Sequence, residues 1–166
     1  MLTLAIDPSG NFTEGKGHTG VAGIKDNDWS TVFTKSVNAS DYESRFEYWT
    51  AVKKIIQDYV IEKTPIQVVI ESYVVRANGF TTGKMPETAM LIGVLVYFCE
   101  MSGVPVYFQS PSQAKTRFRD GLIPTYIPQM TVDKNRYYLG KKLTNDHERD
   151  ALKHLLFFKR YKEYRI

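Results

Sequence analysis

Two carboxylates in this sequence each end a short apolar run. Asp7 follows the run Leu2–Ile6, and Glu71 follows Gln67–Ile70. A third acidic cluster, Asp146-His147-Glu148-Arg149-Asp150, lies near the C-terminus. One acid at the end of a strand is often only the first polar residue of a loop. If the fold brings these groups together, however, mutual repulsion raises some of their pKa values unless divalent cations neutralise them. The pattern therefore points to a metal-dependent hydrolase.

The elements that carry these acids give them a way to meet. If the two apolar runs form adjacent parallel strands, both carboxylates reach the same edge of the sheet. On the last helix, His147 and Asp150 are three residues apart and share a face. Asp146 stands at the first helical position, where it has an alternative role in complementing the helix dipole. Glu148 falls on another face, and His154, one to two turns deeper, is interpreted as a packing residue.

Composition limits the classes of protein to consider. The 166 residues predict one domain over 1–166, with 43% hydrophobic residues to form its core. We expect neither a membrane span nor a signal peptide, because no run of about 18 apolar residues and no basic N-terminal region occurs. Cys99 is the only cysteine, which excludes an internal disulfide and fits a reducing cytoplasm.

Charge is distributed unevenly along the chain. Residues 111–166 contain 13 Lys and Arg against 6 Asp and Glu, whereas residues 1–110 contain 9 against 12. A basic C-terminal third favours a polyanionic partner such as nucleic acid. The alternative is an ordinary solvated helical surface, and charge alone does not separate the two.

Hydrophobic periodicity and turn signals predict an α/β domain. Strands are expected at 2–7, 19–25, 30–36, 67–71 and 104–108. Helices are expected at 41–62, where Ser40 and Glu43 form a capping box, at 87–102, from Ser110, from Thr131 to about Lys142, and from Asn145. Residues 121–130 are expected to form a loop. The order of these elements predicts a mixed five-stranded sheet, in which a three-strand antiparallel meander joins two parallel strands flanked by helices.

The segment Gly15-Lys16-Gly17-His18-Thr19-Gly20 matches the G-x-G-x-x-G pattern of nucleotide-binding sites. A dinucleotide site requires this pattern to open a helix, but here a predicted strand follows. The chain is also too short for a kinase, and it lacks a catalytic loop and an Asp-Phe-Gly motif. We therefore expect no nucleotide cofactor, and we expect these glycines to permit a tight turn or the close approach of a phosphodiester backbone.

Taken in order, the motifs of the chain resemble the RuvC family of Holliday-junction resolvases, within the RNase H-like superfamily, and most of all its shorter phage-type members. The resemblance spans about residues 1–157. Its carriers are Leu4-Ala5-Ile6-Asp7-Pro8-Ser9-Gly10, Val68-Val69-Ile70-Glu71, the helix Thr88–Glu100 with Leu91-Ile92-Gly93, Ser112-Gln113-Ala114-Lys115, and His147-x-x-Asp150-Ala151-Leu152. Each motif is weak alone, and their order and spacing make the resemblance specific.

The resemblance implies a set of site residues. The family's catalytic and metal-binding tetrad falls on Asp7, Glu71, His147 and Asp150. Some members carry an acid at the third position, so Asp146 is the alternative to His147, which we favour because it shares a helix face with Asp150. The implied DNA-binding residues are Lys115, Lys134 and Tyr73. The family's stacking aromatic aligns with Val74, and Tyr73 beside it is the candidate for that role.

The resemblance also implies the activity, the cofactor and the partners. The expected activity is endonucleolytic cleavage of four-way or other branched DNA junctions in recombination and repair, with two Mg²⁺ ions at each active site and Mn²⁺ as a plausible substitute. The expected assembly is a homodimer through helix 87–102, in the cytoplasm, or in the host cytoplasm if the protein is encoded by a bacteriophage. Two alternatives stay open: another RNase H-like nuclease that cuts RNA–DNA hybrids or flaps, and a junction-binding module without catalysis.

Overall fold

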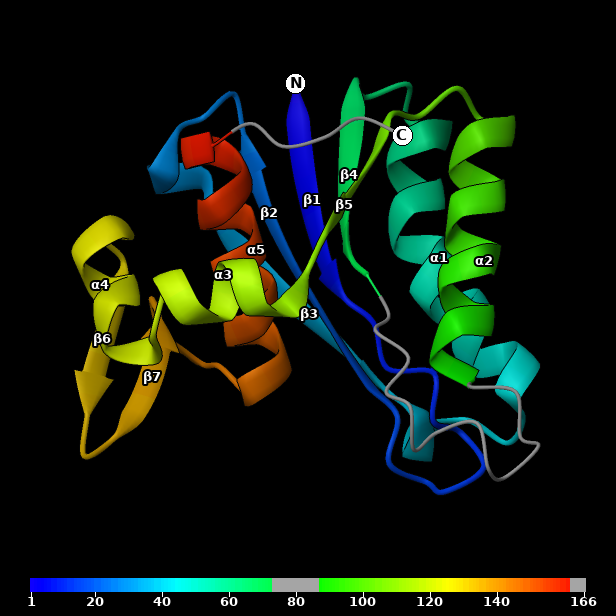
Figure 1. Ribbon diagram of the computed structural model, residues 1–166, viewed down its shortest axis with the longest axis horizontal. Helices are drawn as coiled ribbons and strands as arrows, with labels where there is room; N and C mark the ends of the chain where they lie inside the picture. The colour runs from blue at the N-terminus through cyan, green and yellow to red at the C-terminus, as the bar shows by residue number, and fades with distance from the viewer. Residues whose placement is uncertain (73–86, 162–166) are drawn as a thin grey trace.

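A five-stranded mixed sheet forms the centre of the molecule (Figure 1). The computed structural model describes residues 1–72 and 87–161. The strands are β1 (Leu2–Asp7), β2 (His18–Lys25), β3 (Phe33–Asn38), β4 (Ile66–Glu71) and β5 (Val106–Gln109). Their order is β3-β2-β1-β4-β5, with β1 antiparallel to β2 and parallel to β4. The predicted sheet, including its antiparallel meander and its two parallel strands, is confirmed.

Helices cover both faces of this sheet. In Figure 1, α1 (Arg45–Ile61) and α2 (Glu87–Met101) lie on one side, and α3 (Pro111–Arg117) and α5 (Asp146–Tyr161) lie on the other. Alternate residues of β1 divide between the two cores, as the two-residue period of a strand requires. Leu4 and Ile6 pack with α1 and α2, whereas Ala5 packs with α5. Small side chains on the second face let α5 lie close to the strands.

The start of α1 differs from the prediction. The helix begins at Arg45, and its cap is Ser44 rather than Ser40. The Ser44 hydroxyl accepts a hydrogen bond from the Glu47 N–H at 3.2 Å, which completes a capping pair four residues later in the chain than expected. Residues Ala39–Asp41 instead form a 3-10 turn. The buried face of α1 is formed by Tyr48, Val52 and Ile56.

The segment after α3 also differs from the prediction. Residues 131–142 form no helix but a small antiparallel sheet of β6 (Met130–Asp133), β7 (Arg136–Leu139) and β8 (Lys142–Leu143). Lys134 and Asn135 both adopt positive φ, at 47° and 63°, which is the geometry of a two-residue hairpin turn. A hairpin around the turn at Lys134 and Asn135 thus replaces the helix that was expected from Thr131.

The expected loop at 121–130 is partly helical. A 3-10 turn at Asp120–Leu122 leads into α4 (Ile123–Tyr126), with Pro124 in its first turn. Ile123 and Ile127 are fully buried in the core on the α5 side of the sheet, so this segment is anchored by packing. None of the helices in the described part of the chain is long and apolar enough to cross a membrane.

Candidate active site

Asp7 is the last residue of β1, where it is 5% exposed and lies opposite Gly20 of β2. The loop that follows is tied to both helices on the α1 side. The Tyr48 hydroxyl donates to the Ser9 carbonyl at 2.6 Å, and the Gly10 N–H donates to the Thr88 hydroxyl at 3.0 Å. These bonds direct the chain after Asp7 toward α1 and α2. The Asp7 carboxylate is thereby left at the edge of the sheet, where β1 ends.

Three carboxylates meet around one ammonium group. The Lys115 Nζ atom lies 3.3 Å from Asp7 Oδ1, 2.9 Å from Glu71 Oε2 and 2.8 Å from Asp150 Oδ2. The acids come from β1, β4 and α5, and Lys115 comes from α3. The short α3 is fixed at its start by Ser110, which forms a capping box with Gln113 as the sequence predicts. The acids that the sequence singled out therefore converge.

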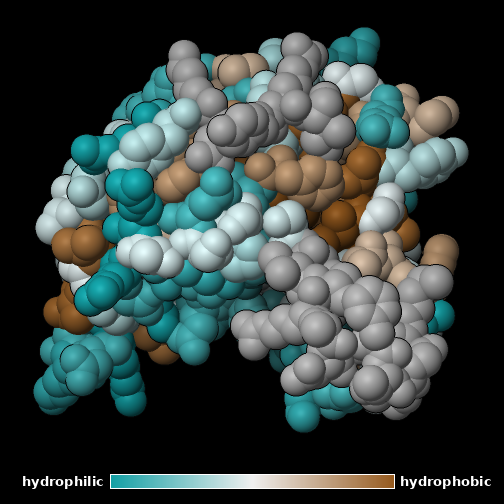
Figure 2. Space-filling model, viewed as in Figure 1, coloured by the Kyte–Doolittle hydropathy of each residue, from teal (hydrophilic) through white to brown (hydrophobic). Residues whose placement is uncertain are grey.

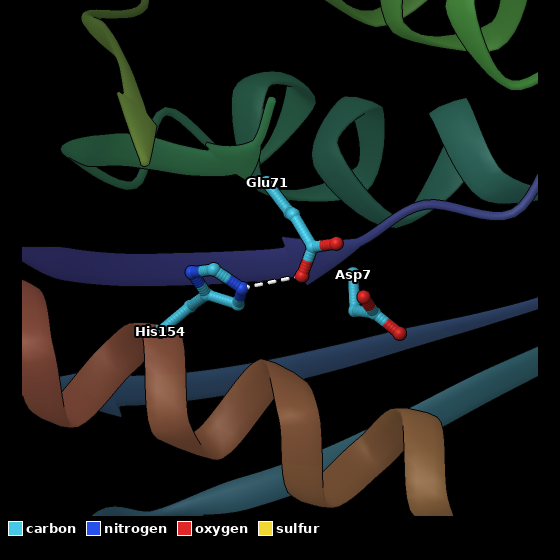
Figure 3. Close-up of side chains that lie close together, drawn as sticks. All are labelled: Asp7, Glu71 and His154. Atoms are coloured by element: carbon cyan, nitrogen blue, oxygen red, sulfur yellow. Dashed lines mark hydrogen bonds and ion pairs between the residues drawn. The ribbon is translucent and has the colours of Figure 1, made fainter. Parts of the chain in front are cut away.

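Two histidines of α5 hold two of these carboxylates. His147 Nδ1 lies 2.7 Å from Asp7 Oδ2, and His154 Nε2 lies 2.6 Å from Glu71 Oε2. Figure 3 shows the His154 ring directed at Glu71, with Asp7 beside them. Gln109 stands on the other side of His154, with its side-chain amide 2.9 Å from Nδ1. When the Gln109 amide donates to Nδ1, the His154 Nε2–H donates to Glu71.

The structure corrects the interpretation of His154 as a packing residue. His154 is fully buried, and it also binds the carboxylate that ends β4. The sequence held a signal for this role, because His154 is seven residues after His147 and four after Asp150, so all three share one helix face. A second residue that the sequence analysis did not select is His18, whose ring stacks on His147 with centroids 5.2 Å apart.

The first turn of α5 separates the two candidates for the third ligand. Asp146 has a side chain that is 88% exposed and pairs with Arg149, so it does not join the cluster. His147 reaches Asp7 from the next position along the helix. Asn145 caps the helix as predicted, with its side chain accepting from the Glu148 N–H at 2.9 Å.

Asp150 is held between two lysines. Lys153 Nζ lies 2.7 Å from Asp150 Oδ1, and it also pairs with Asp120 in the segment before α4. Lys115 contacts the other oxygen of Asp150. Asp120 and Lys153 thus connect the segment between α3 and β6 to the acidic cluster and fix the orientation of Asp150.

Burial and neighbouring charges shift the ionisation of the cluster in opposite directions. Burial raises the pKa of Asp7, and the nearby Glu71 adds to this effect, against the hydrogen bond with His147 and the charge of Lys115. Burial alone would raise the pKa of Glu71 as well, but hydrogen bonds with His154 and Lys115 outweigh it and lower that pKa to about 2. Glu71 is therefore ionised throughout the physiological range, and any proton that the pair retains belongs to Asp7.

The two basic partners of Asp7 hold their protons more tightly than usual. The hydrogen bond with Asp7 raises the pKa of His147, against the opposing effect of burial. Burial would lower the pKa of Lys115, but the charge of Asp7 and the hydrogen bonds with Asp150 and Glu71 outweigh it and raise that pKa. Lys115 is therefore a permanent cation among the carboxylates.

A close backbone contact with Gly20 of β2, the residue opposite Asp7, places the start of α5 against the sheet. A Cβ atom added at Gly20 would lie 2.1 Å from the His147 carbonyl oxygen and 2.7 Å from the Glu148 nitrogen. Only glycine allows this approach, so Gly20 serves the packing of α5 against the sheet. In the same segment, Gly15 has a φ of 64° and makes the expected tight turn.

The remaining predicted site residues lie apart from the acids or beyond the described residues. Lys134 is exposed at the turn between β6 and β7. Tyr73 and Val74 lie outside the residues that the structure describes. The cluster itself offers ligands that suit a hard divalent cation, because Asp7, Glu71 and His154 present ligand atoms within 4.8 Å of one another and Asp150 adds a third carboxylate.

Comparisons with known proteins support the fold. No family model and no curated protein sequence matches the chain. Among solved structures, it resembles T. thermophilus RuvC in complex with a Holliday junction substrate, with a TM-score of 0.68 and 16% identity over 100% of this chain and 99% of that one. It also resembles another Thermus thermophilus RuvC structure, with a TM-score of 0.63 and 16% identity over 98% and 97% of the two chains. The chain has the RuvC fold. The RuvC fold was predicted from the order of the motifs, and its match extends over the whole chain, including the strand ends and the helix that carry the acids.

Proposed function

We propose that this protein is a metal-dependent endonuclease that resolves four-way DNA junctions. The observation that carries the proposal is the meeting of Asp7, Glu71 and Asp150 around a single cation at one edge of a RuvC fold. One of the structures with this fold is a complex with a Holliday junction substrate.

The donor set fits divalent cations. Mg²⁺ prefers oxygen ligands, takes few of them from the protein and leaves room for phosphate and water. Asp7, Glu71, Asp150 and His147 would hold the ions. Such ions supply charge relief at the phosphate and a water of lowered pKa. Mn²⁺ has the same ligand preferences and is expected to substitute.

The side chains of the site have roles of their own. The His147 Nδ1–H donates to Asp7, which fixes the direction of the imidazole ring at the site. The His147 side chain is 39% exposed, so water reaches it. His154 and Gln109 hold Glu71 from the buried side and thereby fix the direction of its carboxylate. The expected products of hydrolysis carry 5′-phosphate and 3′-hydroxyl ends.

Basic residues in the site and on the hairpin of β6 and β7 suit the backbone of DNA. Lys115 is the nearest, from α3. The hairpin of β6 and β7 adds Lys134 and Arg136, both exposed. We propose that Lys115 and Lys134 contact phosphates, and Tyr73 stays the candidate for stacking on a base at the junction. Phosphate contacts of this kind position the nucleic acid without reading its sequence.

The outer face of α2 suits a second subunit. Leu91, Leu95 and Cys99 face the core, whereas Val94, Tyr97 and Met101 are 36%, 67% and 71% exposed. In Figure 2, apolar surface gathers on the side of the molecule where α1 and α2 lie. A junction with two-fold symmetry requires two matched nicks, so we propose a homodimer through this helix.

A cleavage panel tests the proposed function. The wild-type protein is incubated with a four-way junction, a flap, a linear duplex and an RNA–DNA hybrid, each with Mg²⁺ or with a chelator. We expect Mg²⁺-dependent paired nicks in the junction and little cleavage of the duplex. Preferred cleavage of the hybrid would instead indicate another RNase H-like nuclease. Junction binding without any cleavage would indicate a binding module.

A further inference from the structure

Lys115 occupies an unusual position for a residue expected to bind DNA. Its ammonium group makes contacts of 2.8 to 3.3 Å with Asp7, Glu71 and Asp150, so it faces the acids. We propose that Lys115 is the resident counter-ion of the acidic cluster, that a divalent cation must displace it, and that the displaced ammonium then binds a DNA phosphate. This inference rests on the proposed metal-dependent function and adds an order of events to it.

Competition follows from the shared ligands. A divalent cation bound to these three carboxylates would use the same oxygens that the ammonium contacts. Two cations that share ligands at such separations repel each other, and the partly buried site screens that repulsion less than bulk water does. The ammonium and the metal ion therefore exclude each other from the centre of the cluster.

Lys115 is better placed to move than Lys153 and His154, which also hold carboxylates of the cluster. Its side chain is 33% exposed, at the end of a flexible four-carbon stem. Lys153 is only 11% exposed and is fixed by Asp120 as well as by Asp150. His154 is fully buried between Glu71 and Gln109. A displaced Lys115 thus has solvent to enter, whereas the other two groups keep their partners.

The displacement couples metal binding to DNA binding. Before a metal ion binds, the ammonium of Lys115 pairs with the carboxylates. After displacement, the same charge is available to a phosphate at the edge of the site. Because coupling between two sites is reciprocal, DNA that captures Lys115 strengthens metal binding by the same factor. The site would thereby bind metal most tightly when DNA is present.

Calorimetric titration with Mn²⁺ alone, without DNA, tests the competition. Lys115→Met keeps the stem and removes the charge, and Lys25→Met is the control. Lys25 lies on β2 opposite Leu2, which is at the other end of β1 from Asp7. At about 3.4 Å per residue, Leu2 and Asp7 are roughly 17 Å apart. We expect Lys115→Met to bind Mn²⁺ about tenfold more tightly than the wild type or better, within the 5–150-fold range of typical couplings. Lys25→Met should match the wild type.

The outcomes separate this inference from the proposed function. Equal or weaker Mn²⁺ binding by Lys115→Met, with binding by the wild type, would overturn the displacement of Lys115 and leave the metal site standing. No binding by either protein would overturn the metal-dependent function and the displacement together.

A measurement on the wild type covers the case in which Lys115→Met does not fold. In protein labelled with ¹⁵N at lysine, an ammonium that contacts three carboxylates exchanges its protons slowly and gives a resolved Nζ signal. Lys115→Arg, which lacks this signal, assigns it. We expect the signal to disappear or shift as Mg²⁺ saturates the site. A signal that stays unchanged at saturating Mg²⁺ would overturn the displacement.

Discussion

Replacing Gly20 by alanine should move the start of α5 away from Asp7. The added Cβ atom would lie 2.1 Å from the His147 carbonyl oxygen, and ordinary contact begins at 3.4 Å, so the backbone must give by about 1.3 Å. The obstacle is the backbone of α5, which cannot rotate away as a side chain can. Overpacking of this kind costs about 1–3 kcal/mol of stability. A displacement of about 1 Å in the reacting groups costs about 100-fold in rate.

Junction cleavage and thermal unfolding of Gly20→Ala test this estimate together. Gly121→Ala is the matched control, because nothing lies within 4 Å of a Cβ atom at Gly121. We expect Gly20→Ala to stay folded and to lose about 100-fold in cleavage rate, while junction binding changes little. Gly121→Ala should match the wild type in both measurements. Unchanged cleavage by Gly20→Ala would refute the role of this contact in placing the start of α5 beside Asp7. Failure of Gly20→Ala to fold would show that the contact is required for stability.

Three further predictions address other parts of the site. His154→Leu leaves the Glu71 carboxylate without its buried donor, so kcat should fall about tenfold with an unchanged Kd for the junction, and His154→Gln should recover part of the loss; an unchanged kcat in His154→Leu would count against this positioning role. The raised pKa of His147 stabilises the folded protein fully below about pH 6.5, and this stabilisation is lost as the pH rises through the folded-state pKa. In thermal unfolding with a chelator present, the melting temperature of His147→Gln should therefore fall less over this pH range than that of the wild type. An equal fall in both proteins would contradict the interaction of His147 with Asp7. Lys134→Ala should weaken binding to all junction sequences alike and reduce the salt slope by about 0.9, whereas an unchanged slope would argue against a phosphate contact.

Much of the fold follows from local signals that tertiary packing reinforced. The run before Asp7 and the run before Glu71 are apolar on both sides, as buried strands with a parallel pairing must be, and both became central strands. The helix starts at Ser110 and Asn145 also agree with the structure. The Gln113 side chain accepts from the Ser110 N–H, and the Asn145 side chain accepts from the Glu148 N–H.

The differences have physical causes that short motifs do not reveal. Ser40 and Ser44 offer equivalent capping chemistry, and the packing of Tyr48 into the core selects the later start for α1. At residues 131–142, the paired left-handed residues Lys134 and Asn135 decided for a hairpin. Asparagine adopts the left-handed conformation of such a turn readily, but lysine does not, so Lys134 gave no sign of the turn in the sequence.

The site was predictable in its acids and less so in their partners. Strand ends and helix spacing predicted that Asp7, Glu71 and Asp150 would meet. The buried contact of His154 with Glu71 depends on how deeply α5 packs against the sheet, which no local pattern encodes. The inward direction of Lys115 likewise follows from three-dimensional charge balance, since the carboxylates attract the nearest flexible cation.

We propose that Asp7 and its neighbours perform metal-dependent cleavage of branched DNA. Asp7→Asn keeps the size of the side chain and removes its charge, which tests this claim most directly in a Mg²⁺-dependent assay on a synthetic four-way junction. We predict that the cleavage rate falls by about three orders of magnitude, a loss of about 4 kcal/mol of transition-state stabilisation, while junction binding is retained. Cleavage at the wild-type rate by Asp7→Asn would contradict the account.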